Sequence, residues 1–592
     1  MKTFCVQTLG CKVNHYESEQ VAAALRARGL VETSPDRAEL RIINSCSVTV
    51  QAASQSRQAT RRMTRLPVLP NPKYDALTAC EFNPSNPPSS ETATASRARV
   101  LVMGCWATSD KAAAASLPGV DAVLTHGDNV AAELDRLLAA WGLPGDANRP
   151  ALTPPHACVI EPPPDNGFSD GWMMKAGSGA GQRTTDNKTK IANPVNEKSD
   201  EVCAPDEEHP FVREAASGGI GSGRGEQNRD LTGRQRRGTN LLPLLGEHQS
   251  GRQRAFLKIQ DGCDAHCTYC IIPKLRPGLF SKPVEDVICE ARRLVEAGHV
   301  EIVLTGIFLG AYGQPTALRR RQPSGPAPLA QLVDALCKNV PGLRRLRLSS
   351  LEPGDLTDDL LAVLGDHEQV VPHFHLPLQS GSDALLRRMN RQYRRDDFLR
   401  MLDRVAAAFD RPALTTDIIV GFPGEGESEF ARTVEVVERA GFIHVHAFPY
   451  SPRPGTAAAR WQDEFIRGPV VNERINYLRE LANANSLRFR SAFVGQTVEV
   501  IVERGEDVID GRRFRHGRCK RYFPVHFEPD AAQPGDVVCA VVESVMPQMT
   551  IGSVCSTAAP GCVPPAGGNA FRPDGRTQLG AAVPNAFAGS AQ

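Results

Sequence analysis

The first 144 residues contain blocks of apolar positions in which a period of two and a period near 3.6 follow one another. These blocks predict strands and helices in alternation over residues 2–8, 16–28, 40–44, 49–62 and 99–103. Strands that alternate with helices are typical of a parallel sheet with helices on its faces. We therefore expect an amino-terminal α/β domain over residues 1–144.

The segment 254–485 repeats the strand-helix pattern six times. The predicted strands are 256–260, 301–305, 345–349, 373–378, 413–420 and 444–448. Ser281 before Pro283 predicts the start of the first intervening helix, and Gly298 predicts its end. Six successive units indicate a curved parallel sheet, that is, a partial (β/α)6 barrel.

The segment 493–555 has a different pattern. Apolar residues alternate with polar ones over 497–503 and again over 536–544, as in a small antiparallel β-barrel. The fold class that we expect is thus α/β for the first two domains, followed by a small carboxy-terminal barrel.

Three stretches lack periodic patterning: about 63–98, 145–253 and the tail 556–592. They are rich in Gly, Pro, Asn and Ser, or in charged residues, and we predict two disordered insertions and a disordered tail. No apolar stretch approaches the ~20 residues that cross a bilayer. The first residues lack the apolar core and cleavage site of a secretory signal, so we expect a protein of the reducing cytoplasm, with no membrane contact.

Charge gives little information about partners, because 68 basic residues balance 67 acidic ones. Sixteen cysteines in a cytoplasmic protein favour metal chemistry over disulfides. Six of the cysteines fall into two patterns that bear on function.

Cys263, Cys267 and Cys270 lie in one loop, with three and two residues between them. Three thiolates so close together would bind an iron–sulfur cluster or a zinc ion and leave one coordination position open for chemistry. The spacing resembles that of radical S-adenosylmethionine (AdoMet) enzymes, in which AdoMet binds the fourth iron of a [4Fe–4S] cluster. A zinc knuckle that uses His266, a redox dithiol and a disulfide are the alternatives.

Cys11, Cys46 and Cys105 each follow one predicted strand of the amino-terminal domain. Ligands of open parallel sheets collect beyond the carboxyl ends of the strands, so the three thiols should converge. Their convergence suggests a second cluster, and three unrelated loop cysteines are the alternative.

Basic and aromatic residues are interleaved between the strands of the carboxy-terminal segment, in the run 511–523. Such a run suits phosphate contacts and base stacking on RNA, although a solvated basic face would have the same composition. The candidate RNA-binding residues are Arg512, Arg513, Arg515, Arg518, Lys520 and Arg521.

The order of three amino-terminal cysteines, a CxxxCxxC loop and a small barrel resembles the radical-AdoMet methylthiotransferases, which have an amino-terminal methylthiotransferase domain, a radical-AdoMet domain and a TRAM domain. Four stretches resemble the branch that acts on N6-threonylcarbamoyladenosine in tRNA: 8–18, 347–353, 373–383 and 417–425. The branches that act on N6-isopentenyladenosine and on a ribosomal protein are the alternatives among enzymes. A zinc-containing RNA-binding protein without catalysis is the alternative of another class.

The resemblance implies two [4Fe–4S] clusters and AdoMet as cofactors. The cluster on Cys263, Cys267 and Cys270 would generate a 5′-deoxyadenosyl radical, because the unactivated carbon 2 of adenine needs radical chemistry. The auxiliary cluster on the amino-terminal cysteines would present the methylated sulfur. Candidate AdoMet-binding residues just after the barrel strands are Gly306, Ser350, Glu352, Gln379 and Gly421.

The implied partners are the anticodon loop of a tRNA, modified at position 37, an electron donor such as flavodoxin or ferredoxin, and a sulfur source. A monomer is the default expectation. The stretch 273–281 is less basic than in the family, and both insertions depart from it. Flexible insertions cost little, since doubling a loop adds only about 0.6 kcal/mol of closure entropy.

Overall fold

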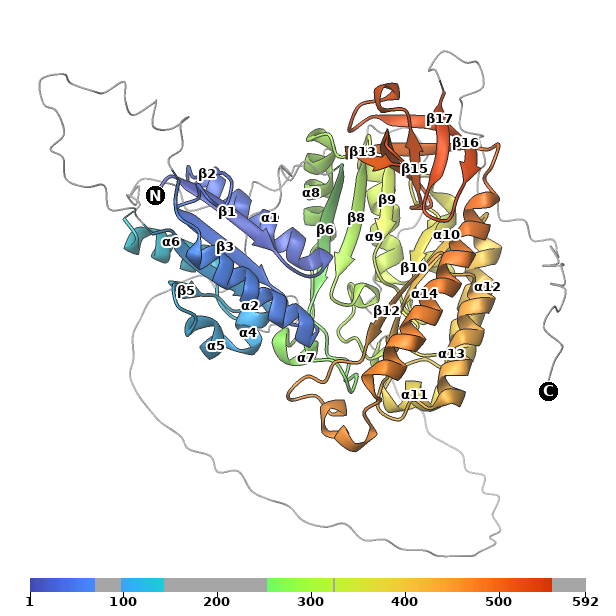
Figure 1. The fold of residues 1–592 in the computed structure, drawn as a ribbon, viewed down its shortest axis with the longest axis horizontal. Helices are drawn as coiled ribbons and strands as arrows, with labels where there is room; N and C mark the ends of the chain where they lie inside the picture. Colours follow the sequence, from blue (N-terminus) through green and yellow to red (C-terminus); the bar gives the residue numbers. More distant parts are fainter. Residues whose placement is uncertain (70–96, 143–252, 323–324, 556–592) are drawn as a thin grey trace, which may run out of the picture. The chain divides into compact units, whose positions relative to one another are not determined.

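The computed structural model describes residues 1–69, 97–142, 253–322 and 325–555. The predicted insertion 145–253, except residue 253, and the predicted tail lie outside these ranges, as does most of the predicted insertion 63–98. The described residues form three modules in the predicted order (Figure 1). Among the described helices, none is long and apolar enough to span a membrane.

The amino-terminal module is built on a parallel five-stranded sheet with the strand order β2-β1-β3-β4-β5. Its strands are β1 (Thr3–Thr8), β2 (Val31–Glu32), β3 (Leu40–Ser45), β4 (Arg99–Gly104) and β5 (Ala122–Val123). Its helices are α1 (Lys12–Ala27), α2 (Val50–Arg65), α4 (Cys105–Ser109), α5 (Lys111–Ala115) and α6 (Val130–Ala140). The predicted parallel α/β sheet is confirmed.

Both faces of this sheet are buried. Ile42 belongs to the apolar core formed with α1 and α6, whereas its neighbour Ile43 belongs to the core formed with α2, α4 and α5. Adjacent strand residues point to opposite faces, so a sheet covered on both sides has continuous apolar strands rather than alternating ones. All six residues of β3 are buried, in agreement with this rule.

The second module contains the six predicted parallel strands in two hydrogen-bonded groups, β7-β6-β8-β9 and β10-β11-β12. The strands are β6 (Arg254–Asp261), β7 (Phe280–Ser281), β8 (Glu301–Gly306), β9 (Arg345–Leu348), β10 (His373–His375), β11 (Ala413–Val420) and β12 (His444–Pro449). A single bridge between Leu346 and Val370 connects the groups. The short antiparallel β7 was not predicted.

Helices follow these strands, and all of them except the short α7 share one large apolar core with the strands. They are α7 (Ile272–Leu275), α8 (Val284–Glu296), α9 (Pro328–Asn339), α10 (Asp358–Asp366), α11 (Asp383–Arg388), α12 (Arg395–Ala408), α13 (Glu427–Ala440) and α14 (Gly468–Ser491). The alternation of strand and helix agrees with the predicted partial barrel.

The third module is a closed five-stranded barrel in the order β13-β14-β15-β17-β16. Its strands are β13 (Thr497–Ile509), β14 (Arg512–Cys519), β15 (Pro524–Phe527), β16 (Val537–Val545) and β17 (Thr550–Val554). The buried Arg345 of β9 joins it to the second module, since its Nε lies 2.8 Å from Glu499 Oε1 and its Nη2 donates to the Glu499 carbonyl at 2.7 Å.

Three predicted boundaries are wrong for identifiable reasons. Helix α1 begins at Lys12 rather than at residue 16, because Cys11 occupies the N-cap without a side-chain cap that the sequence would reveal. Helix α8 has Pro283 as its N-cap, and Ser281 lies in β7 instead, where its hydroxyl accepts from the Gly313 amide. Strand β10 ends at His375, two residues before a proline that has no amide hydrogen for the ladder.

Candidate active site

The three amino-terminal cysteines lie at the carboxyl ends of β1, β3 and β4, and their loops touch. A β-carbon on Gly10 would come within 2.8 Å of Cys46 Sγ, and one on Gly104 would come within 2.4 Å of Asn44 Oδ1. Both glycines have positive φ angles, of 100° and 93°. Only glycine fits these two positions, and the predicted convergence of the three loops is therefore present in the fold.

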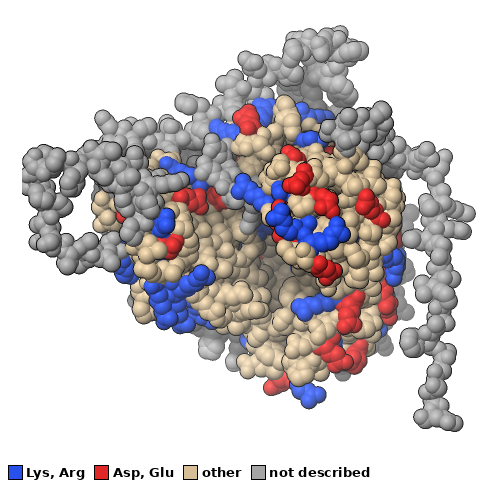
Figure 2. Space-filling view, turned by 45° about the horizontal axis from the view of Figure 1, so that its top comes forward, with Lys and Arg blue, Asp and Glu red and all other residues tan. Residues whose placement is uncertain are grey.

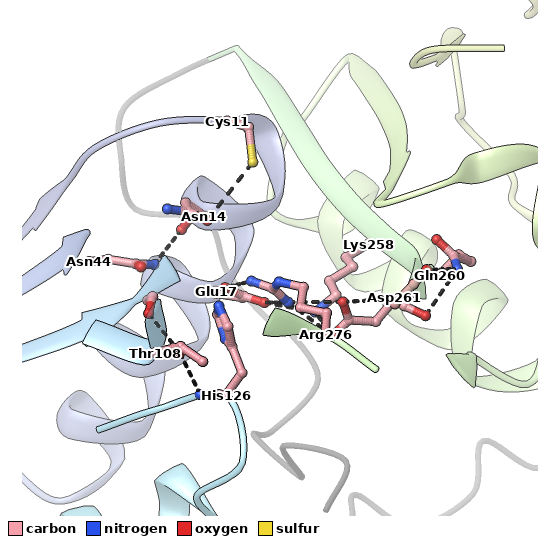
Figure 3. Close-up of polar contacts among 12 residues, drawn as sticks. Cys11, Asn14, Glu17, Asn44, Thr108, His126, Lys258, Gln260, Asp261 and Arg276 are labelled. Carbon is pink, nitrogen blue, oxygen red and sulfur yellow. Dashed lines mark hydrogen bonds and ion pairs between the residues drawn. The ribbon is translucent and has the colours of Figure 1, made fainter. Parts of the chain in front are cut away.

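Two asparagines fix the loops against one another. The Asn14 amide donates to the Leu9 carbonyl at 2.8 Å and to the Ser45 carbonyl at 3.1 Å, and the Asn44 amide donates to the Asn14 carbonyl at 2.9 Å. Asn14 and Asn44 are about 1% and 0% exposed. Figure 3 shows this chain of contacts leading from Asn44 through Asn14 to the Cys11 thiol.

The second cysteine trio lies in the loop between β6 and α7. The Ala265 amide donates to Cys263 Sγ at 3.4 Å, and Arg391 Nη1 lies 3.3 Å from Cys267 Sγ. The other side of the Arg391 guanidinium forms an ion pair with Glu352. This arrangement fixes a positive charge beside one thiol of the trio.

A buried ion network joins the two cysteine-bearing modules (Figure 3). Glu17 of α1 accepts from Arg276 Nη1 at 2.7 Å, from Arg276 Nη2 at 2.9 Å and from Lys258 Nζ at 2.8 Å. Asp261 accepts from the same two cations, at 2.9 Å and 2.7 Å. Burial opposes the charge on Glu17, but the Arg276 and Lys258 cations hold its pKa well below the usual range. We call these four residues the bridge.

A cavity of about 220 Å³ lies between the two modules. Val48 and Thr49 line it from the loop that follows Cys46, and Cys270, Gln379 and Asp417 line it from the second module. The Val50 amide donates to Ser451 Oγ at 2.9 Å at its edge. Loops from both cysteine trios thus border one space. Pockets that enclose an entire small ligand are larger than this cavity, at about 300–1,000 Å³.

The donors around both trios suit iron–sulfur ligation. Backbone amides point at the sulfurs of Cys46, Cys263 and Cys270, and such hydrogen bonds tune the potentials of these clusters. Burial raises the pKa of Cys105 and of Cys270 to about 12, so positive metal charge would be needed to hold them as thiolates.

No three His, Cys, Asp or Glu side chains among the described residues are gathered tightly enough for a single metal ion. Cysteines that each bind a different iron of a cluster are spaced by the cluster and need not form such a tight shell. The donor chemistry and loop positions therefore fit the expected clusters.

Comparison with known proteins gives the family. Residues 257–437 match the model of the Radical SAM superfamily, and residues 3–80 match that of the Uncharacterized protein family UPF0004. The chain is 30% identical over 539 residues to the threonylcarbamoyladenosine tRNA methylthiotransferase MtaB of Bacillus subtilis, covering 91% of this chain and 93% of that protein. The chain belongs to the radical-AdoMet methylthiotransferase family.

The second relative is more similar over a shorter region. This methylthiotransferase is 42% identical over 299 residues to the tRNA-2-methylthio-N(6)-dimethylallyladenosine synthase of Mycolicibacterium paratuberculosis, which covers 50% of this chain and 57% of that protein. Among solved structures, the radical S-adenosylmethionine methyltransferase TsrM from Kitasatospora setae aligns with 78% of this chain and 74% of its own, at 12% identity and a TM-score of 0.42. Membership in the radical-AdoMet superfamily implies a [4Fe–4S] cluster and AdoMet.

The five predicted AdoMet-binding positions differ in their surroundings. Gln379 lines the cavity, has a positive φ of 61° and leaves its buried Oε1 without a hydrogen bond among the described residues. Glu352 binds Arg319 and Arg391, so it acts on the cluster loop through Arg391. A β-carbon on Gly421 would meet Val471 Cγ2 at 2.5 Å, which explains this glycine by helix packing.

The other two positions are less informative. Gly306 ends β8, and a β-carbon there would approach Gln260 at 3.0 Å. Ser350 is exposed in the loop after β9. Of the five predicted AdoMet-binding residues, Gln379 is the one that both lines the cavity and has a buried polar atom without a hydrogen bond to a described residue. Strained backbone of the kind found at Gln379 is common at functional sites.

A polar cluster on the inner face of the second module was missed in the sequence. His375 Nε2 lies 3.1 Å from Asp417 Oδ2 and its Nδ1 lies 3.0 Å from Thr415 Oγ1. The His444 and His446 rings are 4.1 Å apart, and His446 lies 5.9 Å from the His375 ring. Alternate positions on β10, β11 and β12 would have revealed this common face, because residues two apart in a strand share a side.

The basic run of the small barrel is largely paired with acidic residues. Figure 2 shows basic and acidic side chains side by side on the surface that it presents. Glu506 pairs with Arg513 and Arg515, and Glu528 pairs with Arg512. Arg518 pairs with Glu503 at 3.3 Å.

The last two predicted RNA-binding residues differ from each other. Arg521 donates to the carbonyls of Asp410 and Arg411 and so attaches the barrel to the second module. No ion pair of the Lys520 ammonium with another described residue is present. An RNA role for all six basic residues remains a prediction, and Arg521 has a structural role in any case.

A second basic surface lies on α2 and was not among the predicted RNA-binding residues. Arg61, Arg62 and Arg65 are exposed and line a groove with Gln58 and Leu66. None of the three has an ion pair with another described residue. Unpaired arginines on one helix are suited to phosphate contacts.

Proposed function

We propose that this methylthiotransferase converts N6-threonylcarbamoyladenosine at position 37 of tRNA to its 2-methylthio derivative, in the cytoplasm. The observation that carries the proposal is the cavity bordered at once by the loop after Cys46 and by Cys270. A reaction at one base that depends on groups held by both cysteine trios would need such a shared space. The end-to-end similarity to MtaB supports the threonylcarbamoyl substrate.

The residues that would hold the cofactors follow from the two trios. Cys263, Cys267 and Cys270 would bind the radical cluster, with AdoMet at its open iron, and the amino-terminal trio would bind an auxiliary cluster. When bound, these groups supply the radical and sulfur chemistry that no side chain provides. Arg391 keeps a positive charge at Cys267, and Gln379 offers its free carbonyl oxygen to a donor on a ligand in the cavity.

The remaining partners are part of the proposal. The unpaired arginines of α2 would contact the phosphates of the tRNA, together with the barrel residues that remain exposed. An external electron donor and a sulfur source are needed for turnover, since the chemistry consumes both. The similarity to the dimethylallyladenosine synthase over half of the chain favours N6-isopentenyladenosine as the second candidate substrate.

Two measurements test the proposal. The anaerobically reconstituted protein should contain about eight irons, and the triple replacement of Cys11, Cys46 and Cys105 by alanine should reduce the count to about four. An unchanged iron content in that variant would refute the auxiliary cluster.

The substrate is tested separately. Nucleosides of tRNA from a strain that lacks the gene, analysed by mass spectrometry, should lose 2-methylthio-N6-threonylcarbamoyladenosine. Loss of the isopentenyl analogue instead would replace the proposed substrate by the second candidate.

A further inference from the structure

One side of the cavity between the two modules is polar. The Gln379 backbone amide donates to the Asp417 carbonyl at 2.8 Å, and both residues line the cavity. The Asp417 carboxylate is already engaged, since its Oδ2 lies 3.1 Å from His375 Nε2. Gln379 differs, because neither atom of its side-chain amide forms a hydrogen bond with another described residue. The polar side of the cavity thus presents one amide group without a partner.

The backbone of Gln379 is strained. Its φ angle is 61°, and the residue is only 9% exposed. Glycine adopts a positive φ freely, whereas a residue with a β-carbon does so at a cost in free energy. A long amide side chain at this position therefore combines backbone strain with a buried oxygen that lacks its hydrogen bond. Such a combination indicates that a ligand supplies the missing partner.

The rest of the cavity surface is largely aromatic and aliphatic. Tyr269, Phe448 and Tyr450 contribute rings, and Ile271 and Ile419 contribute apolar side chains. Aromatic side chains of this kind pack against the faces of unstacked bases of single-stranded RNA, whose edges are then read by hydrogen bonds. The volume of about 220 Å³ is below that of pockets for entire small ligands, so one flat ring system fits better than a whole cofactor.

The edge of an adenine ring matches the two ends of the Gln379 amide. A glutamine side chain recognises adenine by accepting from N6 and donating to N7. An adenine with a single substituent on N6 keeps one N6–H, which lies beside N7 when the substituent is turned toward N1. The ring therefore offers one donor and one acceptor side by side, as the amide requires.

Two adenines take part in the proposed reaction, one in the RNA and one in AdoMet. Val48 and Thr49 line the cavity from the loop after Cys46, and Cys270 lines it from the other module. A ring in this cavity lies between loops of both cysteine trios. This is the position required of a base whose reaction depends on both trios, and the cavity therefore favours the RNA base over the adenine of AdoMet.

We propose that the cavity holds the adenine ring of the substrate nucleotide, with the Gln379 amide on N6–H and N7 and the aromatic side chains against the ring. Gln379 is then a residue that recognises the base, instead of the AdoMet ligand that the sequence predicts. The inference rests on the proposed function and adds the side chain that selects adenine.

The test uses the full-length, anaerobically reconstituted protein and two synthetic anticodon stem-loops. One carries N6-threonylcarbamoyladenosine and the other its 7-deaza analogue, in which a C–H group replaces N7. Methylthiolation is followed by mass spectrometry, and kcat/KM is determined for each RNA. The wild type should prefer the natural base by about 10-fold, because the analogue leaves the Gln379 N–H without a partner.

Gln379→Gly should lower kcat/KM for the natural RNA and abolish the preference, and Gln379→Met, which keeps the length of the side chain, should do the same. The glycine variant should fold, since glycine adopts this backbone without strain, and thermal unfolding and iron content are measured for each variant. Gln331→Met, at an exposed position of α9, is the matched control and should keep the wild-type preference. Cleavage of AdoMet without RNA should have the same KM for AdoMet in all four proteins.

Three results would overturn the inference: equal kcat/KM for the two RNAs in the wild type, an undiminished preference in the Gln379 variants, or a raised KM for AdoMet in those variants. The last result would assign the cavity to the adenine of AdoMet. Failure of the proposed function has a different signature, because the wild type would then modify only a stem-loop with N6-isopentenyladenosine. In that case the same comparison between this RNA and its 7-deaza analogue decides the inference.

Discussion

Replacing Glu17 by glutamine would test whether the bridge sets the relation between the two cysteine-bearing modules. Glu17 lies on the helix that begins directly after Cys11, and Arg276 lies six residues after Cys270. Both side chains are almost fully buried, at 4% and 3% exposure. The substitution keeps the shape of residue 17 and removes its charge.

The cost follows from the charges that remain. In the wild type, two cations face two carboxylates, and the variant leaves Arg276 and Lys258 with Asp261 alone. Breaking a buried ion pair costs about 3–5 kcal/mol when the remaining charge has no partner. Because Asp261 still binds both cations and the glutamine oxygen still accepts one hydrogen bond, we expect a loss of about 2–4 kcal/mol in the free energy of unfolding.

The assay combines stability with product partition. Urea unfolding is followed by circular dichroism, and the ratio of methylthiolated RNA to 5′-deoxyadenosine is measured in the same preparations. A misplacement of about 1 Å between reacting groups can cost 10²-fold in rate, so the ratio should fall while 5′-deoxyadenosine still forms. Glu133→Gln, which removes an exposed pair with Arg136, is the control and should change stability by less than about 1 kcal/mol.

Two results would contradict this reasoning. A Glu17→Gln protein as stable as the control would show that the bridge contributes nothing measurable. A destabilised variant with an unchanged product ratio would show that the bridge supports folding but does not position the modules for the reaction.

Two further predictions concern pH and salt. Burial, and the nearby Arg276 cation, lower the pKa of His126 to about 4, so the folded state keeps this ring neutral where the unfolded state binds a proton. The free energy of unfolding should therefore fall as the pH drops below about 6.5, and this group should account for a loss of about 2 kcal/mol at pH 5. His126→Asn should flatten the measured dependence of stability on pH. Equal slopes for the wild type and the variant would contradict this prediction. Replacing Arg61 and Arg62 by glutamine should weaken tRNA binding, measured by filter binding. The slope of log affinity against log salt concentration should become shallower by about two units. An unchanged slope would show that α2 is not part of the RNA interface.

Much of the site could be predicted because it depends on local pattern. Each of Cys11, Cys46 and Cys105 follows a strand, and the ends of parallel strands meet at one edge of the sheet. The loops that carry them do touch, with Gly10 against Cys46. The placement of Gln379 after β10 was predicted for the same reason, whereas its strained backbone was not.

The RNA-binding prediction was less informative because composition does not reveal pairing. Arg521 and Arg512 look alike in the sequence, but Arg521 binds carbonyls of the second module and Arg512 binds Glu528. The acidic partner of a basic run comes from other strands, so its availability depends on the folded barrel. The arginines of α2 were overlooked because the sequence does not show that they have no ion pair with another described residue.

The sequence by itself determined the three modules, the six parallel strands of the second module and the position of each cysteine trio after strand ends, because strand and helix periodicity and strand-end geometry are local properties. Only the tertiary structure decided which distant groups meet. Glu17 and Arg276 are 259 positions apart in the chain and meet only because one module packs on another. Charge pairing across such a contact depends on docking geometry to within a few tenths of an ångström, which no pattern of neighbouring residues encodes.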